Sequence, residues 1–175
     1  EIAQTEAFTG QPFASFWMHT KFLQVDGGKM SKSLGNVYTI DDVLAQGFSA
    51  RALRFALLRG HYRQPLNFTW DGMRDASAAL GTLDDLVARL RRAEGAAAGA
   101  AAVEAARSTF EEAMDDDLNV GRALPALYQL RSEALEGRLT GAPAREALSF
   151  LGRVNAVLGV LELEERDLEN EVEGL

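Results

Sequence analysis

The chain has 175 residues, of which 47% are hydrophobic and 25% are charged, ordinary proportions for a globular protein with a buried core. It contains no cysteine, no apolar run of the roughly 18 residues that a membrane span needs and no secretory leader, which excludes disulfides, thiolate metal sites and a membrane protein within this segment. The net charge of −8 is unevenly divided: residues 1–70 carry seven basic and five acidic residues and residues 71–175 carry eleven and 21, so a polyanion would be attracted to the first part.

The first elements are a helix end and a hairpin. Residues 1–9 predict a helix that Gly10 ends. Because the chain begins with Glu1 rather than Met, and already within a helical pattern, we expect a piece cut from a longer protein. Phe22, Leu23 and Val25 precede the sequence Asp-Gly-Gly at 26–28, a pattern typical of a short strand that enters a tight turn.

Helical signals take over after residue 38. Thr39 and Asp42 have the spacing of a capping box, and the Ala/Gly-rich residues 95–102 read as a connector between helices. Pro125 is expected to kink or shorten its helix. From the apolar spacing we expect six helices, at residues 39–47, 49–60, 69–94, 103–114, 120–136 and 143–158. The sequence therefore predicts a mainly α fold, in which a small α/β part precedes an antiparallel helical bundle.

The stretch that indicates chemistry is Gly-Lys-Met-Ser-Lys-Ser-Leu-Gly-Asn at residues 28–36. Lys29 and Lys32 place two ammonium groups on one short loop, Ser31 and Ser33 add hydroxyl groups, and the bracketing glycines let the backbone turn and move. Such a loop can close over a triphosphate and stabilise the charge that develops on it during phosphoryl or nucleotidyl transfer. The alternative is a solvated basic turn.

The lysine usage of the chain favours the functional interpretation of this loop. The chain has fifteen arginines but only three lysines, and two of the three lysines lie within four residues of each other. Because arginine is the usual cation of this sequence, a random pair of lysines on one turn is a poor explanation.

The pentapeptide Lys-Met-Ser-Lys-Ser at residues 29–33 resembles the signature loop of the class I aminoacyl-tRNA synthetases. Three flanking stretches resemble the cysteinyl-tRNA synthetases within that class: EIAQTEAFTGQPFASFWMH before the loop, HYRQPLNF after it and EAMDDDLN further on. Together they extend from residue 1 to about residue 119. The sequence departs from the common Asn-Thr-Pro-Glu continuation of the last stretch, because it has Asn-Val-Gly-Arg at residues 119–122.

The resemblance implies an enzyme that ligates L-cysteine to tRNA(Cys) through cysteinyl-adenylate, with ATP and Mg²⁺. It implies that Lys32 and Lys29 are catalytic, that Ser31 and Ser33 join them in binding ATP, and that Glu1 is one ligand of a Zn²⁺ ion. In that family the other zinc ligands are two Cys and one His, which precede the matched segment. Without the resemblance, Glu1 would be an exposed helix residue.

The resemblance also implies a division of the chain. We expect the end of a Rossmann catalytic domain with the ATP loop at 1–38, stem-contact helices at 39–94, an Ala/Gly linker at 95–102, a tRNA-binding helical bundle of the DALR type at 103–160 and an acidic tail at 161–175. We further expect a cytoplasmic protein, a monomer, with no membrane partner.

Three other patterns are weighed. Asp115, Asp117 and Asn119 have the spacing that opens a calcium loop, but Val120 and Ala126 replace its required Gly and Glu, so we expect helix-capping roles instead. His19 has a structural role or faces the active site. Residues 61–63, His-Tyr-Arg, contact tRNA or form a packing corner. No Ser-His-Asp triad is indicated.

The sequence is also compatible with two other functions. One is the related ligase of mycothiol synthesis, which joins cysteine to an amino sugar with the same type of loop. The other is a non-catalytic helical binding module, because most of a catalytic domain is not contained in these residues.

Overall fold

The computed structural model describes residues 1–163. In chain order the elements are α1 (Ile2–Thr9), β1 (Leu23–Val25), β2 (Gly28–Lys29), the 3-10 helix η1 (Lys32–Leu34), α2 (Ile40–Ala45), α3 (Ala50–Leu58), β3 (Leu66–Phe68), α4 (Trp70–Arg92), α5 (Ala100–Asp115), α6 (Val120–Leu135) and α7 (Gly141–Leu158). The described residues thus form a mainly α fold with one small sheet, as the sequence predicts.

A three-stranded sheet in the order β2-β1-β3 supports the first part of the chain. Strand β1 pairs antiparallel with β2, and it pairs parallel with β3 in a register that sets Val25 beside Phe68. Both of these side chains are buried. Since parallel strands need a crossover, the chain passes through η1, α2 and α3 between β1 and β3.

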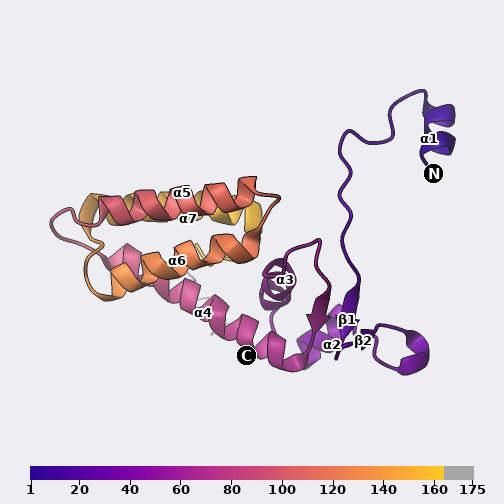
Figure 1. The fold of residues 1–175 in the computed structure, drawn as a ribbon. Helices are drawn as coiled ribbons and strands as arrows, with labels where there is room; N and C mark the ends of the chain where they lie inside the picture. The colour runs from indigo at the N-terminus through magenta and orange to yellow at the C-terminus, as the bar shows by residue number, and fades with distance from the viewer. Residues whose placement is uncertain (164–175) are drawn as a thin grey trace, which may run out of the picture.

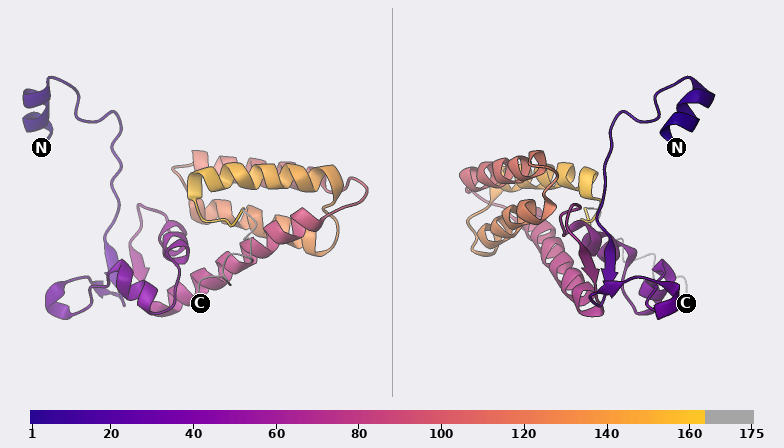
Figure 2. Two further views of the ribbon diagram at one scale, coloured as in Figure 1. Left: turned by 180° about the vertical axis from the view of Figure 1, so that it is seen from behind. Right: turned by 45° about the vertical axis from the view of Figure 1, so that its right-hand side comes forward.

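Helix α4 connects the sheet region to the bundle. It packs against α3, α6 and α7, and in Figures 1 and 2 it runs from the sheet to the far end of the bundle. Apolar residues at helical spacing along it are buried, namely Met73, Ala76, Leu80, Leu83, Leu86, Val87 and Leu90. One core therefore extends through both parts of the structure.

The residues before β1 form an arm that projects from this body (Figures 1 and 2). Helix α1 buries none of its residues. Phe8 and Phe16 on the arm are 92% and 93% exposed. Gly10 ends α1 in the left-handed conformation, as predicted. Large apolar side chains exposed in this way are typical of a surface that another protein segment covers.

Two details of the helices differ from the sequence prediction. Helix α5 begins at Ala100, three residues early, because the alanines of the Ala/Gly-rich stretch favour helix. Pro125 lies inside α6, which continues to Leu135; of the two predicted effects, a kink or a shortened helix, the shortening is therefore wrong. Proline has no backbone N–H, so it removes one helical hydrogen bond.

The sequence analysis did not predict β3 as a strand. The expected acidic tail falls mostly on residues 164–175, which lie outside the described residues. None of the helices in residues 1–163 has the length and apolar character that crossing a bilayer requires.

Candidate functional site

A two-residue turn begins the candidate site. Asp26 and Gly27 have φ values of 49° and 77°, the left-handed pair that joins two antiparallel strands with their natural twist. The turn aligns Gln24 with Lys29 and Val25 with Gly28. Lys29 therefore follows directly from a fixed hairpin.

Strand β3 anchors this hairpin. The side-chain oxygen of Asn67 accepts the backbone N–H of Gly27 at 2.8 Å, and the carbonyl of Phe68 accepts the N–H of Asp26 at 3.1 Å. The turn is thus bonded to the sheet at two successive residues. The base of the loop is therefore hydrogen-bonded to the sheet.

Asn36 closes the loop that follows β2. Its Oδ1 accepts the N–H of Ser31 at 2.9 Å, and its Nδ2 donates to the carbonyl of Lys29 at 3.1 Å. Between these bonds Met30 is half-buried and packs against the core. Gly35 ends η1 with a φ of 65°, the left-handed conformation that favours glycine. Residues 29–36 therefore form a closed loop with one glycine at its return.

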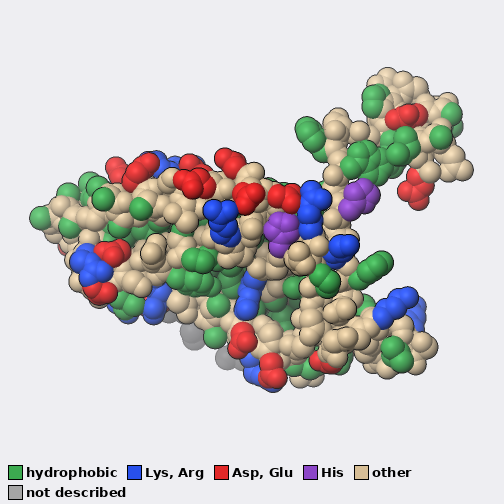
Figure 3. All heavy atoms as spheres, in the orientation of Figure 1, with side chains coloured by type: hydrophobic (Ala, Val, Ile, Leu, Met, Phe, Trp, Pro, Cys, Tyr) green, Lys and Arg blue, Asp and Glu red, His purple; other side chains and the backbone are tan. Residues whose placement is uncertain are grey.

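Both lysine side chains of the loop are exposed. Among the described residues, neither the side-chain amine of Lys29 nor that of Lys32 has an ion-pair or hydrogen-bond partner. In Figure 3 the loop is the lobe at the lower right, where basic side chains lie away from the acidic surface of the bundle. The hydroxyls of Ser31 and Ser33 lie 3.2 Å apart. The loop thus presents two unpaired cations and two hydroxyls to an incoming anion.

Two carboxylates follow the loop in sequence, Asp41 and Asp42, and the second is engaged in a helix cap. Thr39 and Asp42 form the predicted capping box, in which the Thr39 N–H donates to Asp42 Oδ2 at 2.7 Å and the Asp42 N–H donates to Thr39 Oγ1 at 3.2 Å. The hydrogen bond from the Thr39 backbone lowers the pKa of Asp42. Asp42 therefore caps α2, and within residues 1–163 it forms no ion pair with Lys29 or Lys32.

Glu1 and His19 both lie on the projecting arm. Glu1 precedes α1, is exposed and makes no side-chain cap bond. His19 is also exposed, and its ring stacks on Trp17 at 6.1 Å. Within residues 1–163 no three acidic or histidine side chains come together to hold a metal ion. Glu1 alone does not make the four-ligand site that structural zinc prefers.

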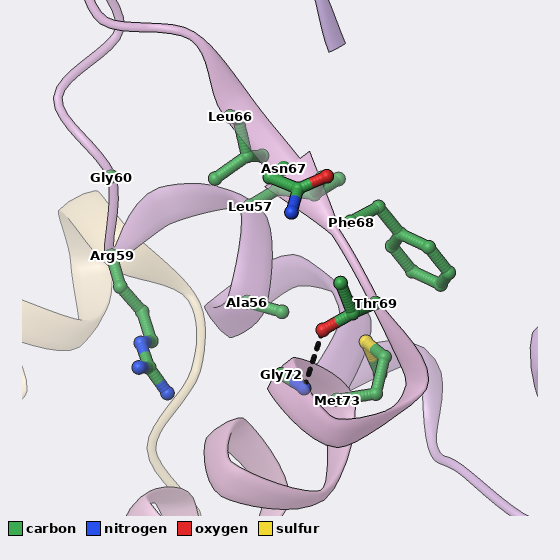
Figure 4. A pocket seen from close by; sticks show the side chains of 10 residues that line it. All are labelled: Ala56, Leu57, Arg59, Gly60, Leu66, Asn67, Phe68, Thr69, Gly72 and Met73. Atoms are coloured by element: carbon green, nitrogen blue, oxygen red, sulfur yellow. Dashed lines mark hydrogen bonds between the residues drawn. The ribbon is translucent and has the colours of Figure 1, made fainter. Parts of the chain in front are cut away.

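A pocket of about 250 Å³ lies elsewhere, between α3, β3 and the start of α4 (Figure 4). Thr69 Oγ1, on its wall, accepts the N–H of Gly72 at 2.9 Å, so this polar atom already has a partner. Neither lysine of the loop lines the pocket. It is therefore a different place from the candidate site.

Residues 61–63 form a corner with the helical bundle. Tyr62 and Arg63 both bond Asp117, which lies in the turn between α5 and α6. In the same turn the side chain of Asn119 accepts the N–H of Arg122 at 3.1 Å and caps α6, as predicted. The contact between this corner and Asp117 was not predicted, because the two segments are 54 residues apart in sequence.

Two family models match parts of the chain. Residues 1–78 match a family model described as the catalytic domain of class I (C) tRNA synthetases, and residues 109–162 match the DALR domain. A cysteine–tRNA ligase of Chlamydia caviae is 39% identical over 170 residues, which cover 92% of this chain and 36% of that protein. A cysteine–tRNA ligase of Geobacter sulfurreducens is 40% identical over 177 residues, with 91% and 36% covered. The chain therefore spans little more than a third of the length of these relatives.

Proposed function

Because the chain belongs to the cysteinyl-tRNA synthetase family of class I enzymes, we propose that it supplies the ATP-phosphate loop and tRNA-contacting helices of a cysteine–tRNA ligase of the relatives' full length. In that reaction the carboxylate of cysteine attacks the α-phosphorus of ATP, the bond to the β-phosphate breaks, and pyrophosphate leaves. A ribose hydroxyl of tRNA then attacks the carbonyl carbon of cysteinyl-adenylate and releases AMP.

The observation that carries the proposal is the pair of unpartnered lysines on a loop closed by Asn36. Lys32 lies in η1 and Lys29 at the end of β2, so both amines extend from a short piece of fixed backbone. In their proposed role they contact the triphosphate and stabilise the charge that moves onto pyrophosphate. Ser31 and Ser33 add hydrogen bonds to the phosphate oxygens. Mg²⁺ accompanies ATP as its counterion.

The proposal includes Glu1 as one carboxylate ligand of a zinc ion. Its support is the resemblance of the first residues to the family and the exposure of a side chain without a cap bond. Within residues 1–163 no three possible ligands lie together, so three further ligands would come from other parts of the full-length enzyme. When bound, the zinc would recognise the thiolate of the substrate cysteine.

The remaining parts of the proposal concern the helices. Residues 39–94 contact the stem of tRNA(Cys), residues 95–102 link them to a bundle at 103–160, and the bundle orients the tRNA. The match to the DALR domain supports the role of the bundle, and the excess of basic residues before residue 71 favours the first part as the side that faces the nucleic acid. We also propose that the enzyme is a cytoplasmic monomer.

Pyrophosphate exchange into ATP tests the proposal. The full-length enzyme that contains this segment is expected to exchange pyrophosphate only when cysteine is present, and to charge tRNA(Cys). Transfer of cysteine to an amino sugar instead of tRNA would identify the mycothiol-type ligase. Absence of any cysteine-dependent exchange would leave only the helical binding module.

A further inference from the structure

Three consecutive residues of the loop between α3 and β3 converge on one carboxylate. Asp117 accepts hydrogen bonds from the Tyr62 hydroxyl and from Arg63, whose Nε lies 2.6 Å from Oδ2. A second guanidinium nitrogen of Arg63 donates to Oδ1 at 3.2 Å, and His61 Nε2 lies 3.7 Å from Oδ2. A planar guanidinium that makes two bonds to a carboxylate fixes direction as well as distance. Asp117 is therefore held in one orientation.

The turn that carries Asp117 has an unusual backbone. Asp117 and the following Leu118 have φ values of 59° and 56°. For leucine this left-handed conformation is uncommon and persists where surrounding contacts impose it. The turn is closed by the N–H of Asn119, which bonds the carbonyl of Ala113 at 3.0 Å. The strained turn thus presents the carboxylate to the α3–β3 loop.

Just after this turn, the backbone at the start of α6 lies close to the backbone at the end of α3. A Cβ atom on Gly121 would lie 3.0 Å from the carbonyl of Arg59, closer than nearly all real contacts of this kind. Glycine at the start of α6 therefore permits an approach that a side chain would oppose. The bundle therefore contacts the segment after α3 in two ways: through the side chain of Asp117 and through the backbone at Gly121.

Below these contacts the two parts of the structure are incompletely packed. A mainly apolar crevice of about 460 Å³ separates them, and its walls include Leu57 and His61 on one side and Met114, Leu118 and Val157 on the other. The shared core along α4 joins the two parts, and the polar contacts at the edge of the crevice connect them where apolar packing does not fill the space. A second set of contacts lies at the start of α3, where Arg51 donates to the carbonyl of Val160.

Hydrogen bonds connect this corner to the ATP loop. The carbonyl of Tyr62 accepts the N–H of Lys21 at 2.9 Å, just before β1. Strand β3 then pairs with β1, and its Asn67 bonds Gly27 in the hairpin turn. The loop with its two lysines is built on the strand that the corner supports.

We propose that Asp117 is a positioning residue that sets the orientation of the bundle, α5 to α7, relative to the ATP-phosphate loop. In the enzyme it holds the tRNA-binding helices so that the acceptor end of tRNA meets the adenylate. This functional consequence rests on the proposed function, whereas the orientation itself does not. Asp117 has no bond to the ATP-phosphate loop, so we expect its replacement to affect tRNA-dependent transfer and not adenylate formation.

A distance measurement on this chain tests the orientation. The sequence has no cysteine, so Asp41→Cys on α2 and Thr109→Cys on α5 accept one spin label each, and pulsed electron resonance gives their distance distribution. Asp117→Asn keeps the size of the side chain and is expected to broaden or shift that distribution. The matched control is Asp116→Asn, because Asp116 pairs with Arg122 inside the same turn, at 2.8 Å.

An unchanged distribution in Asp117→Asn, or the same change in both variants, would overturn the proposal. Circular dichroism is the check that each variant retains its helices. The charge swap Asp117→Arg with Arg63→Asp is expected to restore the narrow distribution, which a general loss of stability would not do. If Asp117→Asn leaves the distribution unchanged and the charge swap does not give the narrow distribution, a specific pair of Arg63 and Asp117 does not set the orientation.

Kinetics on the full-length enzyme test the consequence. Asp117→Asn is expected to reduce kcat/KM for tRNA by about 10-fold or more, since misplaced reacting groups lose rate steeply, and to leave cysteine-dependent pyrophosphate exchange at its original rate. Equal losses in both steps, or no loss in either, would contradict the positioning role. Absence of exchange in the unsubstituted enzyme would instead refute the proposed function, and the label distances would still decide the orientation.

Discussion

The side-chain amide of Asn36 donates to the backbone carbonyl of Lys29 at 3.1 Å. The same side chain accepts the N–H of Ser31, so Asn36, the last residue of the loop, is bonded to the backbone at the start of the loop. Lys32 and Ser33 lie within that closed segment. The loop therefore has a defined shape before any nucleotide binds, and opening it requires breaking two bonds of one side chain.

Replacing Asn36 by alanine is expected to open the loop. Each of the two hydrogen bonds contributes about 0.5–1.5 kcal/mol net, so the closed loop loses about 1–3 kcal/mol relative to the open one. Limited digestion with trypsin measures this, because trypsin cuts after lysine and needs an extended backbone. Cleavage after Lys29 and Lys32 should accelerate in the variant.

Lys21 provides the internal reference for this digestion. It is exposed on the arm and its side chain has no bond to Asn36, so cleavage after it should keep its original rate. Equal acceleration at all three lysines would indicate general unfolding and would contradict the local role of Asn36.

Lys29→Ala in the full-length enzyme is expected to slow cysteine-dependent pyrophosphate exchange, because one of the two phosphate contacts is lost. The loss should be milder than for Lys32, at about 1–2 kcal/mol of transition-state stabilisation. Lys21→Ala is the matched control, since it removes the third lysine of the chain but none from the loop. Equal effects of the two variants would mean that net charge, and not the loop, governs the rate.

Arg51→Ala is expected to destabilise the fold. Arg51 makes two bonds to the carboxylate of Asp84, at 2.9 and 2.7 Å, and one to the carbonyl of Val160 at 3.1 Å. The hydrogen bond with Asp84 raises the pKa of Arg51. Loss of these charged bonds should cost about 1–2 kcal/mol of the free energy of unfolding in urea. Arg74→Ala removes only an exposed pair with Asp71 and should cost less than about 0.5 kcal/mol.

The contact between Arg63 and Asp117 has a definite pH dependence. The hydrogen bond from Arg63 lowers the pKa of Asp117, and the bond from Tyr62 lowers it further. A carboxylate with a lowered pKa in the folded state stabilises that state above its ordinary pKa, and the contribution is lost as the pH falls through the lowered value. The contact should therefore persist at neutral pH and disappear only in acid.

Nuclear magnetic resonance of the Asp117 carboxyl carbon measures that titration. Arg63→Ala is expected to raise the pKa of Asp117 towards its ordinary value, because the largest stabilising partner is removed. In Asp117→Asn the pKa of Tyr62, which the bond to Asp117 raises, should fall. An unchanged titration of Asp117 in Arg63→Ala would contradict the bond geometry.

Features fixed by neighbouring residues were predictable from the sequence. The capping box of Thr39 and Asp42 and the left-handed end of α1 at Gly10 depend only on a few adjacent residues. The hairpin turn followed from Asp-Gly-Gly in the same way, and the long α4 followed from its apolar spacing.

Features that depend on distant partners were not predictable. Strand β3 has three residues after a proline, and it is a strand because β1 pairs with it. The contact of Asp117 joins segments that are distant in sequence, and its left-handed turn has no glycine to announce it. The closing role of Asn36 is local, and an asparagine directly after a glycine at the end of a loop was a signal that could have indicated it. The roles of Lys29, Lys32, Ser31, Ser33 and Glu1 stay predictions.

The most direct measurement is cysteine-dependent pyrophosphate exchange by the full-length enzyme with Lys32→Ala. We predict a loss of about 10²–10³ in rate, equivalent to about 2.7–4 kcal/mol of transition-state stabilisation, with the free energy of unfolding unchanged because the Lys32 side chain is exposed and has no partner in residues 1–163. Exchange at the unsubstituted rate would contradict the assignment of this loop to the ATP phosphates.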